Sequence, residues 1–313
     1  MSLQVVIGNG PAGAATAALL AEQGERVRMI SRSPRENEPR LEHVALDAAD
    51  QAALAEATKG ATAIYSCAAP PYPRWATDWP PLQASICAAA EANDALVVSL
   101  GNLYGYGPVD GPLTENLPLA ATGTKGRIRA LLSEQLHAMH DEGRLRMVEV
   151  RASDFFGPGV TDGGHLAARV VPNVLRRQKV QVFGDPDAPH SWTYISDVAR
   201  TLVAAAREEK AWGKAWHVPT GPPRSARVMV ALLCEAAGVA PVAVQRLSPM
   251  LLNAGALVSP MLRELREVRY QFDLPFVLDS QAAQEFFDIA PTAEKDQFAR
   301  TVAWWRDRSA TVS

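Results

Sequence analysis

The stretch that decides the fold is Leu3-Gln4-Val5-Val6-Ile7-Gly8-Asn9-Gly10-Pro11-Ala12-Gly13, near the start of a chain of 313 residues. The apolar run Leu3–Ile7 predicts a buried strand, and Pro11–Gln23 predicts a helix directly after the turn. Gly8, Gly10 and Gly13 have GxGxxG spacing, which in this context lets backbone N–H groups and a helix N-terminus approach a pyrophosphate. The turn, with Asn9, Pro11 and Ala12, is therefore predicted to bind a dinucleotide; the alternative is an ordinary glycine-rich turn.

The rest of the first half repeats this alternation of short apolar runs and helical stretches. Strands are predicted at Arg26–Ile30, Val44–Leu46, Ala61–Ser66, Ala95–Leu100 and Leu145–Val150. Such a pattern is typical of a parallel sheet covered by helices on both faces. The predicted fold is α/β, a doubly wound parallel sheet (Rossmann) with a smaller C-terminal α+β domain. Residues 1–165 are assigned to the nucleotide-binding domain and 166–313 mostly to a substrate-binding domain, with segments around 190–215 returning to the first.

Composition narrows the class of partner. Hydrophobic residues make up 48% and charged residues 21%, and the net charge is −3, so nothing favours disorder, nucleic acid or an anionic membrane surface. Cys67, Cys87 and Cys234 lie far apart and form neither a metal motif nor a disulfide framework. No signal peptide or membrane span is recognisable. We therefore expect a cytoplasmic protein that acts on a small-molecule substrate and holds no metal.

The end of the second predicted strand bears on which dinucleotide is bound. Ser31 and Arg32 stand where an acidic residue would hold the ribose hydroxyls of NAD or FAD, and Arg35 is close by. A hydroxyl and a guanidinium suit a ribose 2′-phosphate, because arginine makes bidentate, charge-assisted bonds to phosphate. NADP(H) is therefore predicted, although the glycine turn also resembles the FAD fingerprint of flavoproteins, and Arg32 could be a solvated loop arginine.

Six further segments occur in an order that resembles one family. They are Val44-Ala45-Leu46-Asp47, Ser66-Cys67-Ala68-Ala69-Pro70, Val97–Gly105 with Ser99, Asn102 and Tyr104, Thr114–Pro118, Arg151–Gly159, and Phe183–Asp185 followed by Trp192–Ala199. Together they resemble the extended short-chain dehydrogenases/reductases of the NAD(P)-dependent epimerase/dehydratase type. The resemblance implies that Asp47 meets the adenine, that Ala68 and Ala69 lie beside the cofactor, and that Lys125 holds the nicotinamide ribose. It also implies dimerisation through two helices, one of them Gly126–Glu142.

The catalytic positions of that family are partly empty here. The family uses a Ser or Thr and a Tyr-x-x-x-Lys motif, but Ala121 stands four positions before Lys125. Leu100 occupies the usual Ser/Thr position, with Ser99 one place early. The chain thus resembles the atypical branch, in which Lys125, Tyr104, Tyr106 or Asp154 could supply the proton. A desolvated lysine beside a cationic nicotinamide is one candidate acid/base.

Three functional hypotheses remain open besides a flavoprotein. The favoured one is an NADP(H)-dependent oxidoreductase of reductase or epimerase type. The second is a non-redox isomerase, lyase or cyclase that binds the cofactor, and the third is a sensor without catalysis. Product formed at constant NADPH would select the second hypothesis.

The substrate side is predicted from aromatic and imidazole residues. Tyr72 and Trp75 follow the fourth strand, as either an apolar lid or the core of a surface loop. Asn102, Phe155, His165, His190 and Trp192 lie on segments that line the substrate pocket in the family. His190 and Ser191 stand where nucleotide-sugar enzymes usually carry an arginine, so a diphosphate would lose a bidentate partner. We therefore expect a small ketone, enone or alcohol. Asp197 is expected to make a capping or structural bond.

Overall fold

The computed structural model describes residues 2–33, 36–161, 163–248 and 264–311. A seven-stranded sheet in the order β10-β6-β5-β4-β1-β2-β3 forms its centre, and all its pairings are parallel. Its strands are β1 (Leu3–Ile7), β2 (Arg26–Ser31), β3 (Leu41–Ala45), β4 (Ala61–Ser66), β5 (Leu96–Asn102), β6 (Arg146–Ala152) and β10 (Ala215–His217). The predicted fold class is confirmed.

The strand order reverses between β1 and β4. β1 pairs with β2 on one side and with β4 on the other, so the chain crosses from one half of the sheet to the other at this point. Open α/β sheets bind ligands in the crevice beyond the carboxyl ends of the strands, at such a reversal. The glycine turn after Ile7 and the segment after Ser66 therefore meet at the expected ligand edge.

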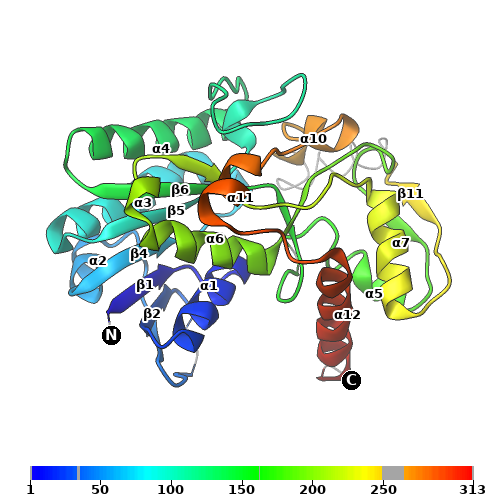
Figure 1. The fold of residues 1–313 in the computed structure, drawn as a ribbon, viewed down its shortest axis with the longest axis horizontal. Coiled ribbons are helices and arrows are strands. Elements are labelled where there is room, and N and C mark those ends of the chain that lie inside the picture. Colours follow the sequence, from blue (N-terminus) through cyan, green and yellow to red (C-terminus); the bar gives the residue numbers. More distant parts are fainter. Residues whose placement is uncertain (1, 34–35, 162, 249–263, 312–313) are drawn as a thin grey trace.

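Helices cover both faces of the sheet (Figure 1). α1 (Pro11–Glu22) and α6 (Ile195–Arg207) pack together on one face. α2 (Gln51–Ala57), α3 (Trp75–Asn93) and α4 (Thr124–Asp141) cover the other. The central strands β1 and β4 are almost fully buried between them, which explains their mostly apolar sequences, whereas the edge strand β3 is partly exposed. Within the described residues, no helix has the length and apolar character needed to cross a membrane.

The C-terminal elements lie beside the sheet, at the right of Figure 1. α5 (Val171–Leu175), α7 (Ala226–Ala237) and α12 (Glu294–Thr311) pack against one another. Two small parallel pairs accompany them: β7 (Asp154–Phe156) with β9 (Trp192–Tyr194), and β8 (Val180–Val182) with β11 (Val244–Arg246). The shorter helices are α10 (Tyr270–Asp273) and α11 (Gln281–Phe287). α6 and β10, by contrast, belong to the main sheet and its cover.

Several boundaries differ from the sequence prediction. The sequence pattern predicts a helix over Leu82–Ala92, but α3 begins earlier, at Trp75, before the Pro80-Pro81 pair. Trp75 and Trp79 are both buried, and this packing outweighs the hydrogen bonds that the two prolines cannot make. The sequence pattern also predicts a helix over Leu166–Arg177, but only the short helix α5 forms there. The third strand lies a few residues earlier than predicted.

Candidate functional site

The glycine turn after β1 is packed so tightly that side chains are excluded from it. Gly8 has a φ of +102°, and a Cβ atom there would lie 2.5 Å from the backbone nitrogen of Ala68. A Cβ at Gly13 would lie 1.9 Å from the carbonyl oxygen of Gly8. Gly10, the N-cap residue of α1, faces open space with no heavy atom within 4 Å of its would-be Cβ. The buried Oδ1 of Asn9 has no partner among the described residues. Open space beside a helix N-terminus fits a pyrophosphate.

The segments that would bind the adenosine end lie along the same edge. Ser31 ends β2, and its hydroxyl donates to the carbonyl oxygen of Ser33 at 2.7 Å. Arg32 is exposed, and within the described residues its side chain makes no hydrogen bond or ion pair. Asp47 is also exposed and accepts from the backbone of Ala49 at 3.1 Å. Arg35 lies outside the described residues. The site thus presents a hydroxyl and a guanidinium at the end of β2.

The end of β4 closes the turn from the other side. Ala68 packs against Gly8, and Ala69 follows it with more exposure. The Cys67 side chain lies near Gly13, and burial raises the pKa of its thiol to about 12. The thiol is therefore protonated and unreactive at neutral pH.

An aromatic cluster stands beyond β4 and β5. Tyr72, in a single 3₁₀ turn at Tyr72–Arg74, places its hydroxyl 2.6 Å from that of Tyr104, in the 3₁₀ turn Tyr104–Tyr106 after β5. The Trp75 ring stacks on Tyr104 at 5.9 Å and meets Trp79 edge-on at 6.1 Å. Trp75 is buried and donates from Nε1 to the carbonyl oxygen of Pro70 at 2.8 Å. This segment was expected to form either an apolar lid or the core of a surface loop. Trp75 is packed as core, and the Tyr72 hydroxyl faces that of Tyr104.

The two hydroxyls remain protonated at neutral pH. Burial raises the pKa of Tyr72 to about 12, against the opposing effect of its hydrogen bond with Tyr104. Burial also raises the pKa of Tyr104 well above its ordinary value, and Tyr72 and the Asp154 carboxylate add to that rise. Both phenols can donate hydrogen bonds, but neither is a base near pH 7.

Lys125 begins the first turn of α4 and is nearly fully buried. Its ammonium group forms ion pairs with Glu264 and with Glu267, the second at 3.6 Å, and lies 5.7 Å from the centre of the Tyr72 ring. Its backbone nitrogen donates to Glu267 at 2.6 Å. The two carboxylates stabilise a charged ammonium group. Sequence reasoning missed both glutamates because they are more than a hundred residues away and belong to no motif.

Asp154 and His190 form a pair that sequence reasoning placed only as separate candidates. Nε2 of His190 lies 2.9 Å from Oδ2 of Asp154, and Nδ1 lies 3.0 Å from the carbonyl oxygen of Gln271. Two other candidates lie apart from this pair. Asn102 accepts from the backbone of Tyr104 at 3.2 Å and so shapes the turn after β5. Ser99 lies inside β5, paired in register with Ser66 and Glu149.

Aromatic rings enclose the imidazole groups. His165 stacks on Phe272 at 4.3 Å and on Trp192 at 5.7 Å. Burial lowers the pKa of His165 to about 4, so its ring is neutral. A hydrogen bond with the backbone of Phe183 engages that ring, whereas Nε2 is buried without a partner among the described residues. Phe155, in β7, is half-buried at the edge of the main core. The substrate-side candidates therefore provide an apolar wall with one unused acceptor.

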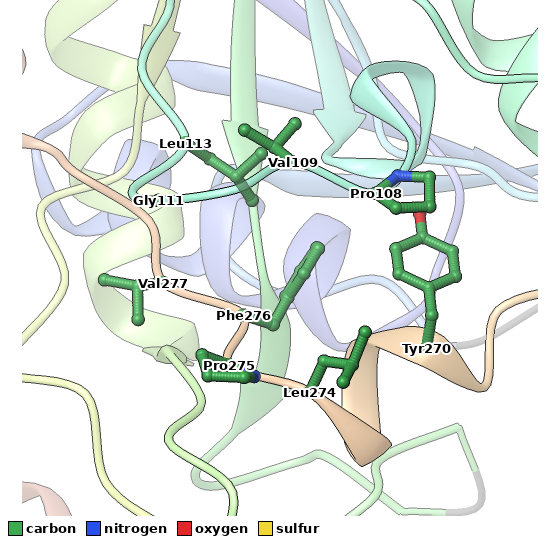
Figure 2. Close-up of a pocket in the computed structure, with 9 residues that line it drawn as sticks. All are labelled: Pro108, Val109, Gly111, Leu113, Tyr270, Leu274, Pro275, Phe276 and Val277. Carbon is green, nitrogen blue, oxygen red and sulfur yellow. The ribbon is translucent and has the colours of Figure 1, made fainter.

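A small apolar hollow lies on the other side of His190, between residues 108–113 and 270–277. Figure 2 shows Phe276 pointing toward Val109 and Tyr270 toward Pro108. The opposite face of the Phe276 ring stacks on His190 at 5.5 Å. None of the described residues that line this hollow is charged, so they offer no group for acid/base chemistry.

A buried polar network under β5 and β6 holds residues that the sequence did not bring together. Oε2 of Glu149 accepts from Ser133 at 2.7 Å and from Arg151 at 2.8 Å. Arg151 also donates to the hydroxyl of Tyr106 at 2.7 Å, which lies 2.8 Å from Nε2 of His217. Tyr106 therefore belongs to this network and not to the acid/base candidates.

Asp197 lies in the first turn of α6. It accepts from the backbone and the hydroxyl of Thr292 and pairs with Arg200. This contact joins α6 to the segment before α12, as the expectation of a structural bond required.

Comparisons with known proteins give the same architecture. The model of the NAD dependent epimerase/dehydratase family matches residues 5–218. No curated protein sequence matches this chain significantly. The chain is similar to dTDP-glucose 4,6-dehydratase from Streptomyces venezuelae, a double mutant solved with NAD bound (TM-score 0.80, 21% identity, 99% of this chain and 98% of that chain covered). It is also similar to an epimerase from Methanothermobacter thermautotrophicus (TM-score 0.81, 18% identity, 99% of this chain and 94% of that chain covered). A further similar structure is the enzyme WbmH from Bordetella bronchiseptica in complex with NAD⁺ (TM-score 0.73, 22% identity, 98% of this chain and 99% of that chain covered). At these identities the structural likeness shows the fold alone.

Proposed function

Since the chain belongs to the NAD dependent epimerase/dehydratase family, we propose that it is an NADP(H)-dependent oxidoreductase of the atypical branch, acting on a small organic carbonyl or alcohol. One observation carries the proposal. The open glycine turn and a cluster of Tyr72, Tyr104, Lys125 and Asp154 lie along the same carboxyl edge of the sheet, while the family's Tyr-x-x-x-Lys motif is absent. The chain thus has the glycine turn that would bind the cofactor, but the acid/base groups beside it differ from the family's Tyr-x-x-x-Lys motif.

The cofactor fits the residues present. The turn Gly8–Gly13 would hold the pyrophosphate, Asp47 the adenine, and Lys125 the nicotinamide ribose, beside Ala68 and Ala69. A nicotinamide dinucleotide bound there supplies a hydride donor or acceptor. Solved neighbours that hold NAD support a nicotinamide dinucleotide, whereas the preference for a 2′-phosphate rests on Ser31 and Arg32 of this chain.

The substrate assignment rests on the wall opposite that edge. His165, Trp192 and Phe155 present aromatic surface, and His190 is engaged by Asp154. His190 and Ser191 stand before Trp192 where nucleotide-sugar enzymes usually carry an arginine, so a diphosphate would lack a bidentate partner there, which disfavours nucleotide sugars. A neutral carbonyl compound suits this surface.

Replacing Arg32 by glutamate should weaken NADPH binding about ten- to a hundredfold, the loss expected for a hydrogen bond to a charged group. NADH has no 2′-phosphate, so its affinity should stay unchanged. Fluorescence titration of both cofactors measures the effect. Arg26→Glu, the same exchange at the opposite end of β2, is the matched control and should change neither affinity. Equal affinities of Arg32→Glu and wild type for NADPH would refute the 2′-phosphate assignment.

The proposed reaction is tested with a carbonyl panel. NADPH should raise the melting temperature by mass action, and at least one ketone or enone should be reduced with matching NADPH consumption. Product formed at constant NADPH would indicate a non-redox enzyme instead. Stabilisation by NADPH without any turnover would indicate a binding protein, and a yellow protein that FAD stabilises would indicate a flavoprotein.

A further inference from the structure

The side chains of Asp154 and His190 are placed to share a proton. β7 and β9 pair in parallel with Asp154 opposite Trp192, which brings Asp154 beside the segment that carries His190. Nε2 of His190 lies 2.9 Å from Oδ2 of Asp154. The two side chains differ in exposure, 3% for His190 and 20% for Asp154. The carboxylate is thus the member of the pair that a substrate can reach.

The hydrogen bonds determine how many protons the pair carries. Nδ1 of His190 faces the carbonyl oxygen of Gln271, which can only accept, so Nδ1 must carry a hydrogen. The contact between Nε2 and the carboxylate oxygen also needs a hydrogen. The pair therefore exists either as imidazolium and carboxylate or as neutral imidazole and carboxylic acid. Both forms use the same contacts, so the proton can move between the two groups without any rearrangement of side chains.

The surroundings of His190 hold the ring in place. Trp192 lies 4.3 Å, Phe272 5.1 Å and Phe276 5.5 Å from the imidazole centre. The residue Gln271 that supplies the carbonyl is itself fully buried. Because these groups enclose the imidazole, a proton passes between His190 and a bound substrate through the Asp154 carboxylate.

Asp154 lies close to the groups that face the proposed reaction. Its charge acts on the hydroxyls of Tyr72 and Tyr104. Those phenols stay protonated and can orient a substrate oxygen by donating hydrogen bonds. Lys125 is held by Glu264 and Glu267. The phenols stay protonated and two carboxylates engage the lysine, whereas Asp154 combines exposure with a partner that stores a proton.

We propose that Asp154 is the catalytic acid/base of this protein and that His190 is its positioning residue, which holds the transferred proton. The inference rests on the proposed function. In the oxidising direction the O–H proton of the alcohol moves to the Asp154–His190 pair in its deprotonated form. An oxidised nicotinamide held at the glycine turn would accept the hydride from the alcohol carbon, whose bond to oxygen would then become the carbonyl double bond. In the reducing direction the pair returns its proton to the carbonyl oxygen as the carbon receives the hydride.

The first test needs neither cofactor nor substrate. Nitrogen NMR of the histidine rings, with His190 identified by the loss of its signals in His190→Gln, reports the hydrogen on each nitrogen. In wild type the Nε2 signal should be that of a nitrogen sharing a hydrogen with a partner. In Asp154→Asn it should move to the position of a bare acceptor nitrogen, while Nδ1 stays protonated. An Nε2 that is already bare in wild type, with no change in Asp154→Asn, overturns the proposal.

The second test uses NADPH and the best carbonyl compound from the panel. Asp154→Asn should lower kcat about 10²- to 10⁴-fold, the range for a lost general acid/base, with NADPH affinity unchanged. Formate should restore part of the turnover of Asp154→Ala, because it supplies a carboxylic acid to the vacated space. Asp185→Asn, the same exchange at an exposed residue that accepts from the backbone of Asp187, should retain full turnover. Wild-type kcat in Asp154→Asn overturns the proposal, whereas a wild type that consumes no NADPH refutes the proposed function and leaves the NMR result to decide the proton store.

Discussion

Replacing Arg151 by methionine is expected to lower the free energy of unfolding by about 3–5 kcal/mol, the usual cost of removing one partner from a buried ion pair. Glu149 and Arg151 have side chains only 5% and 6% exposed, and 2.8 Å separates Oε2 from Nη2. In the variant, Ser133 is the only side chain among the described residues that still donates a hydrogen bond to the carboxylate. Tyr106 loses the donor that Arg151 provides. Urea denaturation followed by tryptophan fluorescence measures the loss.

Two further variants make this result specific. The double variant Glu149→Met with Arg151→Met should recover part of the loss, because neither member of the pair stays buried without the other, although Arg129 loses the nearby Glu149 carboxylate. Arg227→Met removes one partner of an exposed pair, 2.7 Å from Asp187, and should cost no more than about 1 kcal/mol. A loss below about 1 kcal/mol in Arg151→Met would contradict the assigned role of the network.

Lowering the pH should remove the stabilisation that the Glu149–Arg151 ion pair gives the fold. Burial alone would raise the pKa of Glu149, but Arg151 and Ser133 outweigh it and lower the pKa from 4.5 to about 2. A carboxyl group with a lowered native pKa stabilises the fold above its unfolded pKa and loses that effect as the pH falls toward the native value. The difference between wild type and Arg151→Met should therefore shrink as the pH falls from about 4.5 toward 2. A constant difference over that window would contradict the assignment.

Alanine in place of Gly10 is expected to weaken NADPH binding about ten- to a hundredfold while the melting temperature of the cofactor-free protein stays unchanged. The new methyl group meets no protein atom within 4 Å, so the fold accommodates it. It would, however, occupy the space in which the pyrophosphate approaches the N-terminus of α1. Gly13→Ala differs, since its methyl group would lie 1.9 Å from the Gly8 carbonyl oxygen. That variant should lose both affinity and about 1–3 kcal/mol of stability.

Thermal unfolding without ligand and fluorescence titration with NADPH separate the two effects. Gly221→Ala is the control, because its methyl group also meets open space but lies beyond β10, at the edge of the sheet away from β1. It should change neither stability nor affinity. If Gly10→Ala binds NADPH as tightly as wild type does, the glycine turn is not the pyrophosphate site.

Features that local rules govern were predictable. The bounds of β1 and β4 agree with the sequence prediction, because each is a mostly apolar run that borders a glycine, Gly8 after β1 and Gly60 before β4. The start of α3 was not predictable. The local effect of Pro80-Pro81 is unfavourable, and only the burial of Trp75 and Trp79 in the assembled core overrides it. Lys125, Asp154 and His190 are candidates from their motif positions, but the pairing of Asp154 with His190 and of Lys125 with Glu264 and Glu267 was not predictable.

The sequence by itself determined the parallel sheet, the glycine turn, the basic residue after β2 and the absence of the family's tyrosine four positions before Lys125. These depend on spacings of a few residues, over which strand, turn and helix preferences act directly. Only the tertiary structure decided that Asp154 meets His190, that Glu264 and Glu267 hold Lys125, and that Tyr72 meets Tyr104. Such pairs join segments distant in the chain. Packing and the desolvation of charge select them once the sheet has formed, and no local pattern records that selection.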